Sequence, residues 1–163
     1  MKQEFQRAKL ESAVAECDAH LSRLDRGYKL LGAFFPLTPS LLENLDEVRV
    51  EQLDQFLFRF AKLQDAMGSR LFPAVDALVS GNAESRPFID VLMSLEKYRV
   101  VENAGPWQEF RELRNNLSHE YPDNFEESAV TLNLLFQKWP QFRGIYTRIR
   151  DFAISRAPQV SIG

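Results

Sequence analysis

The chain has 163 residues, a length typical of one domain, so a two-domain organisation is disfavoured. Its 45% hydrophobic and 26% charged residues and its net charge of −3 are those of an ordinary globular protein, which excludes a disordered or collagen-like chain. No apolar run approaches the roughly 20 residues of a membrane span, and the charged amino-terminal segment does not resemble a signal peptide. We therefore expect one cytoplasmic domain over residues 1–163, with a core from about residue 3 to residue 155.

The scarcity of certain residue types limits the chemistry of this chain. A single cysteine excludes an internal disulfide, and two histidines leave little material for a metal site, so we expect neither a metal nor a cofactor. We interpret Cys17 as a small packed residue and His20 as a surface or helix-packing residue. The mild acidity argues against a protein that binds nucleic acid through a generally basic surface, but it is compatible with a local basic cleft.

The first half of the chain reads as two long helices with a short one between them. Apolar residues recur every three or four positions over residues 3–31 and again over residues 50–79, which predicts two amphipathic helices. Thr38 and Pro39 predict the cap and first residue of a short helical turn that extends to about residue 45. The second long helix is expected to end at Gly81, because glycine adopts the left-handed conformation of helix ends.

The second half of the chain predicts three further helices. They cover residues 87–99, 107–118 and 124–155, and Asp123 or Asn124 is expected to cap the last one. Pro140 lies inside the last helix and should kink or split it near Trp139. The predicted fold is all-α, an up-and-down bundle of four to five principal helices. The positions expected to face inward in the last helix are Val130, Leu134, Leu135, Phe142, Ile145 and Ile149.

Two surface features have several interpretations. The last helix carries a locally positive stretch, which can flank a cleft and guide RNA, pair with an acidic partner surface, or form a solvated helix face. Phe34 and Phe35 lie in a predicted loop and are candidates for a dimer or partner surface. The residues of the positive stretch are Lys138, Arg143, Arg148, Arg150 and Arg156.

The segment FRELRNNLSHEYPD, residues 110–123, concentrates side chains that are suited to phosphate chemistry. Asn115 and His119 are four residues apart, so the amide can orient the imidazole from one turn away. Arg111 and Arg114 lie on a neighbouring face, and a guanidinium offers a planar set of donors that matches phosphate oxygens. Tyr121 follows just past the expected helix end. These residues make the end of this helix the candidate functional site.

The same segment resembles the Arg-x4-His-x-Tyr signature of the HEPN superfamily, with Arg114, His119 and Tyr121 at the signature positions. The match is closest to the HepT-like toxins, which are encoded beside a small nucleotidyltransferase. Asn115 satisfies the family's preference for a polar residue directly after the arginine. The sequence-specific resemblance covers about fifteen residues, while the order of helices resembles the family over most of the chain.

The resemblance implies a metal-independent endoribonuclease, in which the ribose 2′-hydroxyl attacks the adjacent phosphorus. His119 would serve as base or acid, Arg114 would stabilise the charge of the transition state, and Asn115 and Arg111 would support them. The reaction needs both a base and an acid, and one catalytic histidine per chain cannot be both at the same time. A two-fold homodimer, which is similar to the arrangement of HEPN proteins, would bring a second copy of each group into the cleft.

The resemblance also implies a partner and a modification. A nucleotidyltransferase antitoxin would transfer AMP to Tyr121 and so block the ribonuclease cleft with bulk and negative charge. The other interpretation of Tyr121 is a tyrosine whose ring packs locally. For the whole chain, the alternative to the enzyme is a non-catalytic helical module that binds a nucleotide or docks the nucleotidyltransferase.

Overall fold

The computed structural model describes residues 2–117 and 124–156, and these residues form helices and short turns with no β-strand. The elements are α1 (Lys2–Leu31), η1 (Gly32–Phe34), α2 (Pro39–Glu43), α3 (Glu47–Ala66), η2 (Met67–Leu71), α4 (Phe72–Ser80), α5 (Phe88–Lys97), α6 (Gly105–Leu117) and α7 (Phe125–Arg156).

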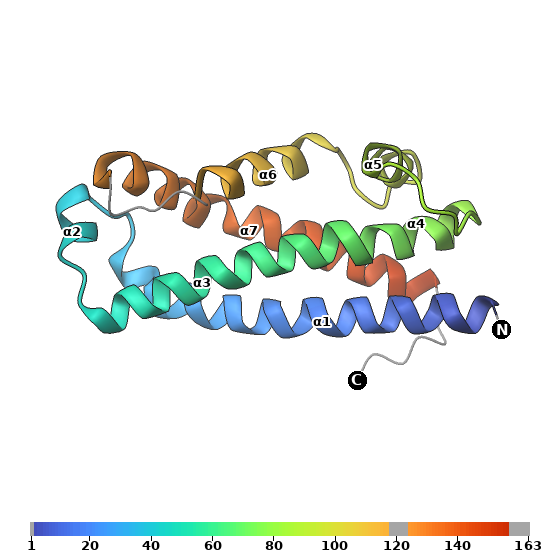
Figure 1. Cartoon of the computed structure of the whole chain (residues 1–163), viewed down its shortest axis with the longest axis horizontal. Coiled ribbons are helices and arrows are strands. Elements are labelled where there is room, and N and C mark those ends of the chain that lie inside the picture. The colour runs from blue at the N-terminus through green and yellow to red at the C-terminus, as the bar shows by residue number, and fades with distance from the viewer. Residues whose placement is uncertain (1, 118–123, 157–163) are drawn as a thin grey trace.

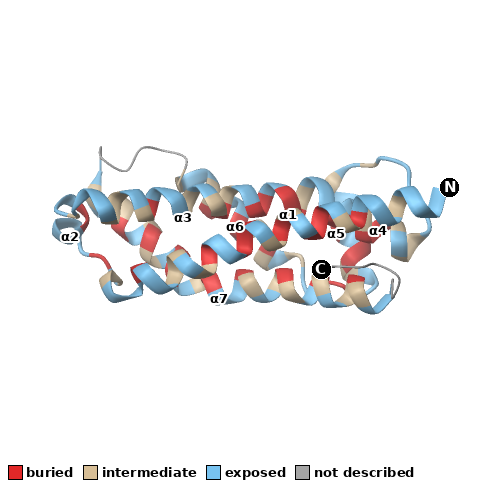
Figure 2. Cartoon of the chain, turned by 90° about the horizontal axis from the view of Figure 1, so that it is seen from below, coloured by how far each residue is buried: buried red, intermediate tan, exposed pale blue. Residues whose placement is uncertain are grey.

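The long helices form an up-and-down bundle. Figure 1 shows that α1 and α6 run in one direction, while α3, α4 and α7 run in the opposite direction. α1 packs along α3, and α6 packs against α7. Figure 2 shows that buried positions recur along the sides of the long helices that face their neighbours. The predicted all-α bundle is confirmed.

The core is rich in aromatic rings from three different helices. The ring of Phe142 on α7 lies 5.0 Å from that of Phe60 on α3 and 4.9 Å from that of Phe110 on α6, measured between ring centres. Trp139 adds a further contact on α7, with its ring 5.8 Å from Phe142. These rings are almost completely buried, so burial of their apolar surface holds α3, α6 and α7 together.

Capping residues set three of the helix boundaries that we predicted. The hydroxyl of Thr38 accepts a hydrogen bond from the amide of Leu41 at 3.0 Å, with Pro39 as the first residue of α2. Asn124 caps α7, because its side-chain oxygen accepts the amide of Glu127 at 3.1 Å. Gly81 ends α4 with a φ of 72°, the left-handed conformation that favours glycine.

The predicted helix over residues 50–79 is wrong in one detail. It begins at Glu47, and a π-helical turn, η2, separates α3 from α4. In this wide turn the amide of Phe72 donates to the carbonyl of Met67, five residues earlier. Pro73 follows directly, has no amide hydrogen to donate, and its ring disturbs the regular helix backbone before it. Apolar spacing alone did not reveal this rearrangement.

Pro140 does not split the last helix. α7 is continuous from Phe125 to Arg156 with Pro140 inside it, so of the two outcomes that we predicted, a kink or a split near Trp139, the split is wrong. Trp139 and Phe142 on either side of the proline are buried in the core. Their packing holds the backbone on both sides, which offsets the loss of one hydrogen bond.

The first turns of α7 present a different face to the core from the one that we predicted. Val130 is 69% exposed and Leu134 is 40% exposed, so the prediction that both turn inward is wrong, and Ile145 is half-buried. Apolar residues occupy more than one face of this part of α7, and the sequence does not say which face meets α2 and α6. The buried set in these turns is Ala129, Leu132, Leu135, Phe136 and Trp139.

The two phenylalanines between α1 and α2 pack within the chain. The ring of Phe35 stacks on that of Phe136, with 3.7 Å between the ring centres. The guanidinium of Arg49 lies 4.6 Å from the ring centre of Phe34. Both phenylalanines are half-buried, and they close this end of the bundle.

Charged residues recur along the two longest helices, α1 with 30 residues and α7 with 32. Within the described residues, no helix has an apolar stretch that could cross a lipid bilayer.

Candidate functional site

The core fixes the orientation of α6, which carries the candidate site at its carboxyl end. Trp107, Phe110 and Leu113 are buried on one face, as their spacing predicted. The amino end is also fastened, because the side-chain oxygen of Asn103 accepts the amide of Gly105 at 2.8 Å. With this face held against the bundle, the polar side chains of the last turns lie at the surface.

Arg114 is bound by an acid from another helix. Its Nη1 and Nη2 atoms donate to the two carboxylate oxygens of Asp65 on α3, at 2.5 and 3.0 Å. The Arg114 side chain is 39% exposed and that of Asp65 is 47% exposed. An exposed ion pair contributes up to about 1 kcal/mol of stability. The pair is bidentate, so a phosphate group would have to replace Asp65 to bind both outer nitrogens of Arg114.

Arg111 lies one turn before Arg114 and has a different environment. Its guanidinium lies 5.5 Å from the ring centre of Phe88 on α5, and no carboxylate among the described residues forms an ion pair with it. The arginine is exposed, so its donors face solvent. Asn115 is exposed in the same last turns of α6. The structure thus places Arg111, Arg114 and Asn115 on one helix end but directs the two guanidinium groups to different neighbours.

His119 and Tyr121 lie outside the described residues, as do the other residues from 118 to 123. The predicted Arg114–His119 pair and the predicted AMP acceptor stay predictions.

Asp65 has no feature in the sequence that marks it as part of this site. It precedes Arg114 by 49 positions, and its position on an exposed part of α3 is that of any solvated acid. Only the packing of α6 beside α3 brings the carboxylate to Arg114.

Most of the positive stretch of α7 is neutralised within the chain. Four of its five cations pair with an acid from another segment, and the fifth, Arg156, has its guanidinium 5.3 Å from the ring centre of Phe152. The hydrogen bonds that Arg143 donates to Asp25 and Arg150 donates to Asp18 raise the pKa values of these two arginines. The pairs are Lys138 with Glu109, Arg143 with Asp25, Arg148 with Glu102, and Arg150 with Asp18.

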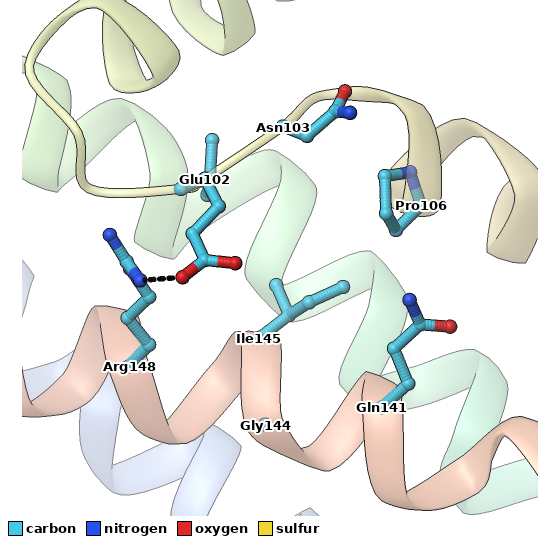
Figure 3. Close-up of a pocket in the computed structure, with 8 residues that line it drawn as sticks. Glu102, Asn103, Pro106, Gln141, Gly144, Ile145 and Arg148 are labelled. Atoms are coloured by element: carbon cyan, nitrogen blue, oxygen red, sulfur yellow. Dashed lines mark hydrogen bonds and ion pairs between the residues drawn. The ribbon is translucent and has the colours of Figure 1, made fainter.

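One of these pairs borders a cavity of about 300 Å³ between α7 and the segment before α6. Figure 3 shows Arg148 and Glu102 turned toward each other at its edge, and the distance between Nη1 and the carboxylate is 2.7 Å. Arg148 also donates to the backbone carbonyls of Val100 and Arg99. Its role is to fasten this segment to α7, and the two charged residues of the cavity neutralise each other.

His20 and Cys17 on α1 have structural environments. His20 is buried between α1 and α3, with its Nδ1 3.1 Å from Nη1 of Arg59. Burial, followed by the charge of Arg59, lowers the pKa of His20, so the imidazole is neutral and Nδ1 accepts. Burial, with the acids Glu16 and Asp18, raises the pKa of the Cys17 thiol to about 12, which suppresses the reactive thiolate. Both residues serve packing, as we predicted.

No group of three or more His, Cys, Asp and Glu side chains within residues 2–117 and 124–156 is arranged to hold a metal ion. The chemistry available at the described part of the site is that of two surface guanidinium groups beside a carboxamide, which suits the binding of an anion such as phosphate. No family model matches this chain, and no curated protein or solved structure shows significant similarity to it.

Proposed function

We propose that this chain is a metal-independent endoribonuclease of a toxin–antitoxin pair, regulated by a nucleotidyltransferase. The observation that carries the proposal is the position of Arg114 at the exposed carboxyl end of α6, five residues before His119. Its guanidinium is held by an exposed carboxylate that a phosphate can replace.

In the proposed reaction the ribose 2′-oxygen loses its proton to a base and bonds to the adjacent phosphorus. The bond from phosphorus to the 5′-oxygen breaks, and an acid protonates that oxygen. The products are a 2′,3′-cyclic phosphate and a 5′-hydroxyl. His119 acts as base or acid, and Arg114 binds the phosphate oxygens as their negative charge increases. Asn115 and Arg111 orient these groups or hold a neighbouring phosphate.

The reaction needs both a base and an acid, and the proposed site therefore includes a second copy of the chain. The exposed Val130 and Leu134 support this arrangement, because they form an apolar stripe on the first turns of α7, directly after the signature segment. Packing of this stripe against its symmetry mate would bring two signature segments close together. A homodimer at micromolar concentration, dissociated by Val130→Asp, is the expected result of analytical ultracentrifugation.

The regulatory step in this proposal transfers AMP from ATP to Tyr121. The tyrosine oxygen bonds to the α-phosphorus, and pyrophosphate leaves. Incubation with ATP and a small nucleotidyltransferase of the proposed antitoxin type should add the mass of one AMP group, and Tyr121→Phe should prevent the addition.

The catalytic proposal is tested by incubating pure protein with RNA and EDTA. The wild type should cut RNA and leave cyclic phosphate ends, whereas Arg114→Ala and His119→Ala should each cut at least about 100-fold more slowly. Arg156→Ala is a matched control, because it removes an arginine from the far end of α7. Equal inactivity of all four proteins would reject the ribonuclease.

One observation favours the non-catalytic module as the second candidate: Asp65 already occupies both outer nitrogens of Arg114. In that case the same helix end docks the nucleotidyltransferase or binds a nucleotide. Binding of the partner by the wild type without any RNA cleavage would support this module.

A further inference from the structure

A solvent-exposed phenylalanine on α3 has two cations beside it. Phe58 is 51% exposed, whereas Phe56 and Phe60 on the same helix are almost completely buried. The guanidinium of Arg59 lies 5.7 Å from the centre of the Phe58 ring, and the ammonium of Lys62 lies 5.5 Å from it. Core packing does not explain the presence of a phenylalanine at this position, because much of its ring faces water.

Phe58 lies in line with the acid that binds Arg114. Phe58, Lys62 and Asp65 are four and three residues apart, so they follow one another along the same stripe of α3. The helical rise separates the backbone of Phe58 from that of Asp65 by about 10 Å along the helix axis. α6 contacts α3, and the ion pair between Arg114 and Asp65 lies at the carboxyl end of α3.

The two cations beside the Phe58 ring can contact an anionic chain, whereas Asp65 farther along the stripe is paired with Arg114. Within the described residues, Lys62 has no carboxylate partner and contacts only the Phe58 ring through its ammonium group. Arg59 is turned in part toward His20, to which its Nη1 is hydrogen-bonded. One cation beside the ring is therefore available to a ligand, and Arg114 adds a second cation farther along the same surface.

We propose that Phe58 is a stacking platform for an unpaired RNA base, with Lys62 and Arg114 contacting the phosphates that flank it. Proteins that bind single-stranded nucleic acid combine such cations with exposed aromatic rings, because every base has a face that stacks. The inference rests on the proposed function in one respect, that the ligand is RNA. It adds a binding surface on α3 that lies outside the signature segment.

The same chain contains a matched control. Phe5 is 61% exposed and has the ammonium of Lys9 at 4.6 Å from its ring centre. It lies in the first turns of α1, at the end of the bundle away from α2 (Figure 1). Phe5 thus reproduces an exposed ring with a cation, but without Arg114 nearby.

The test measures binding of a fluorescein-labelled, single-stranded 2′-O-methyl oligouridylate by fluorescence anisotropy. This RNA lacks the attacking hydroxyl, so binding is separated from cleavage. Phe58→Leu should weaken binding by about 5- to 150-fold, Phe58→Trp should preserve it, and Phe5→Leu should bind like the wild type. An oligomer of the same length without bases should bind equally to the wild type and to Phe58→Leu. Circular dichroism verifies that each variant is folded.

Three results would overturn the inference: wild-type affinity in Phe58→Leu, an equal loss of affinity for the oligomer without bases, or no binding of either oligomer by the wild type. Binding that depends on Phe58, combined with no cleavage of ordinary RNA, would reject the ribonuclease and leave the platform intact. Cleavage that is unaffected by Phe58→Leu, with unchanged affinity, would reject the platform alone.

Discussion

The carboxyl end of α6 and the second half of α7 are both rich in arginine, yet they place these side chains in different surroundings. On α7, Arg143 and Arg150 each donate to an aspartate of α1, and Arg148 pairs with Glu102 while donating to two backbone carbonyls. On α6, Arg111 contacts an aromatic ring, and Arg114 is held by one exposed carboxylate. The ion pairs of α7 thus tie this helix to α1 and to the segment before α6, whereas the pair of Arg114 ties α6 to α3 and leaves the neighbouring Arg111 with donors that face solvent.

The difference between these two regions requires a core that holds α6 in place. Phe142 is completely buried and contacts rings from α3 and α6. Phe142→Ala should lower the free energy of unfolding by about 3–5 kcal/mol, because it removes apolar contacts and leaves a cavity. Urea denaturation measures this change, and a loss below about 1 kcal/mol would show that these contacts do not hold the helices together.

The second prediction compares the two regions directly. Arg114→Ala should lower the rate of RNA cleavage by about 10²–10³-fold, as expected for loss of a donor to the transition state. Arg143→Ala should leave that rate unchanged, because Arg143 pairs with Asp25 of α1 and is not part of the α6 end. Initial rates under conditions where both variants are folded provide the measurement. Equal losses in the two variants would remove the distinction between the regions.

A third prediction concerns the acid at the α6 end. Asp65→Asn removes a negative charge and weakens the hold on Arg114, so RNA should bind up to about five-fold more tightly, while stability falls by less than about 1 kcal/mol. Anisotropy and urea denaturation measure the two effects. Asp25→Asn is the matched variant on the α7 side and should leave RNA affinity unchanged. Weaker binding by Asp65→Asn would mean that the carboxylate positions Arg114 for its ligand.

The smallest expected effect is on the salt dependence of RNA binding. Each phosphate contact with single-stranded nucleic acid contributes about −0.7 to the slope of log affinity against log salt concentration. Arg114→Ala and Lys62→Ala should each reduce the magnitude of that slope by about this amount, whereas Arg150→Ala should not change it. An unchanged slope in the first two variants would place the phosphate contacts elsewhere.

Much of the architecture was predictable because local signals set it. The spacing of Leu10, Val14 and Cys17 predicted the buried face of α1, and Thr38 and Gly81 marked helix ends through their own conformational preferences. The errors arose where tertiary packing overrode those signals. Neighbouring rings hold α7 continuous through Pro140, and the contact with α2 and α6 selects which apolar face of its first turns is buried.

The sequence by itself determined the helices, their apolar faces, and the grouping of Arg111, Arg114 and Asn115 at the end of one helix, because each depends on neighbours within a few turns. Only the tertiary structure decided which charges are paired. The pairing of Arg114 with Asp65, the pairing of Arg143 with Asp25 and the exposure of Phe58 depend on helices that are distant in sequence and meet when the aromatic core packs.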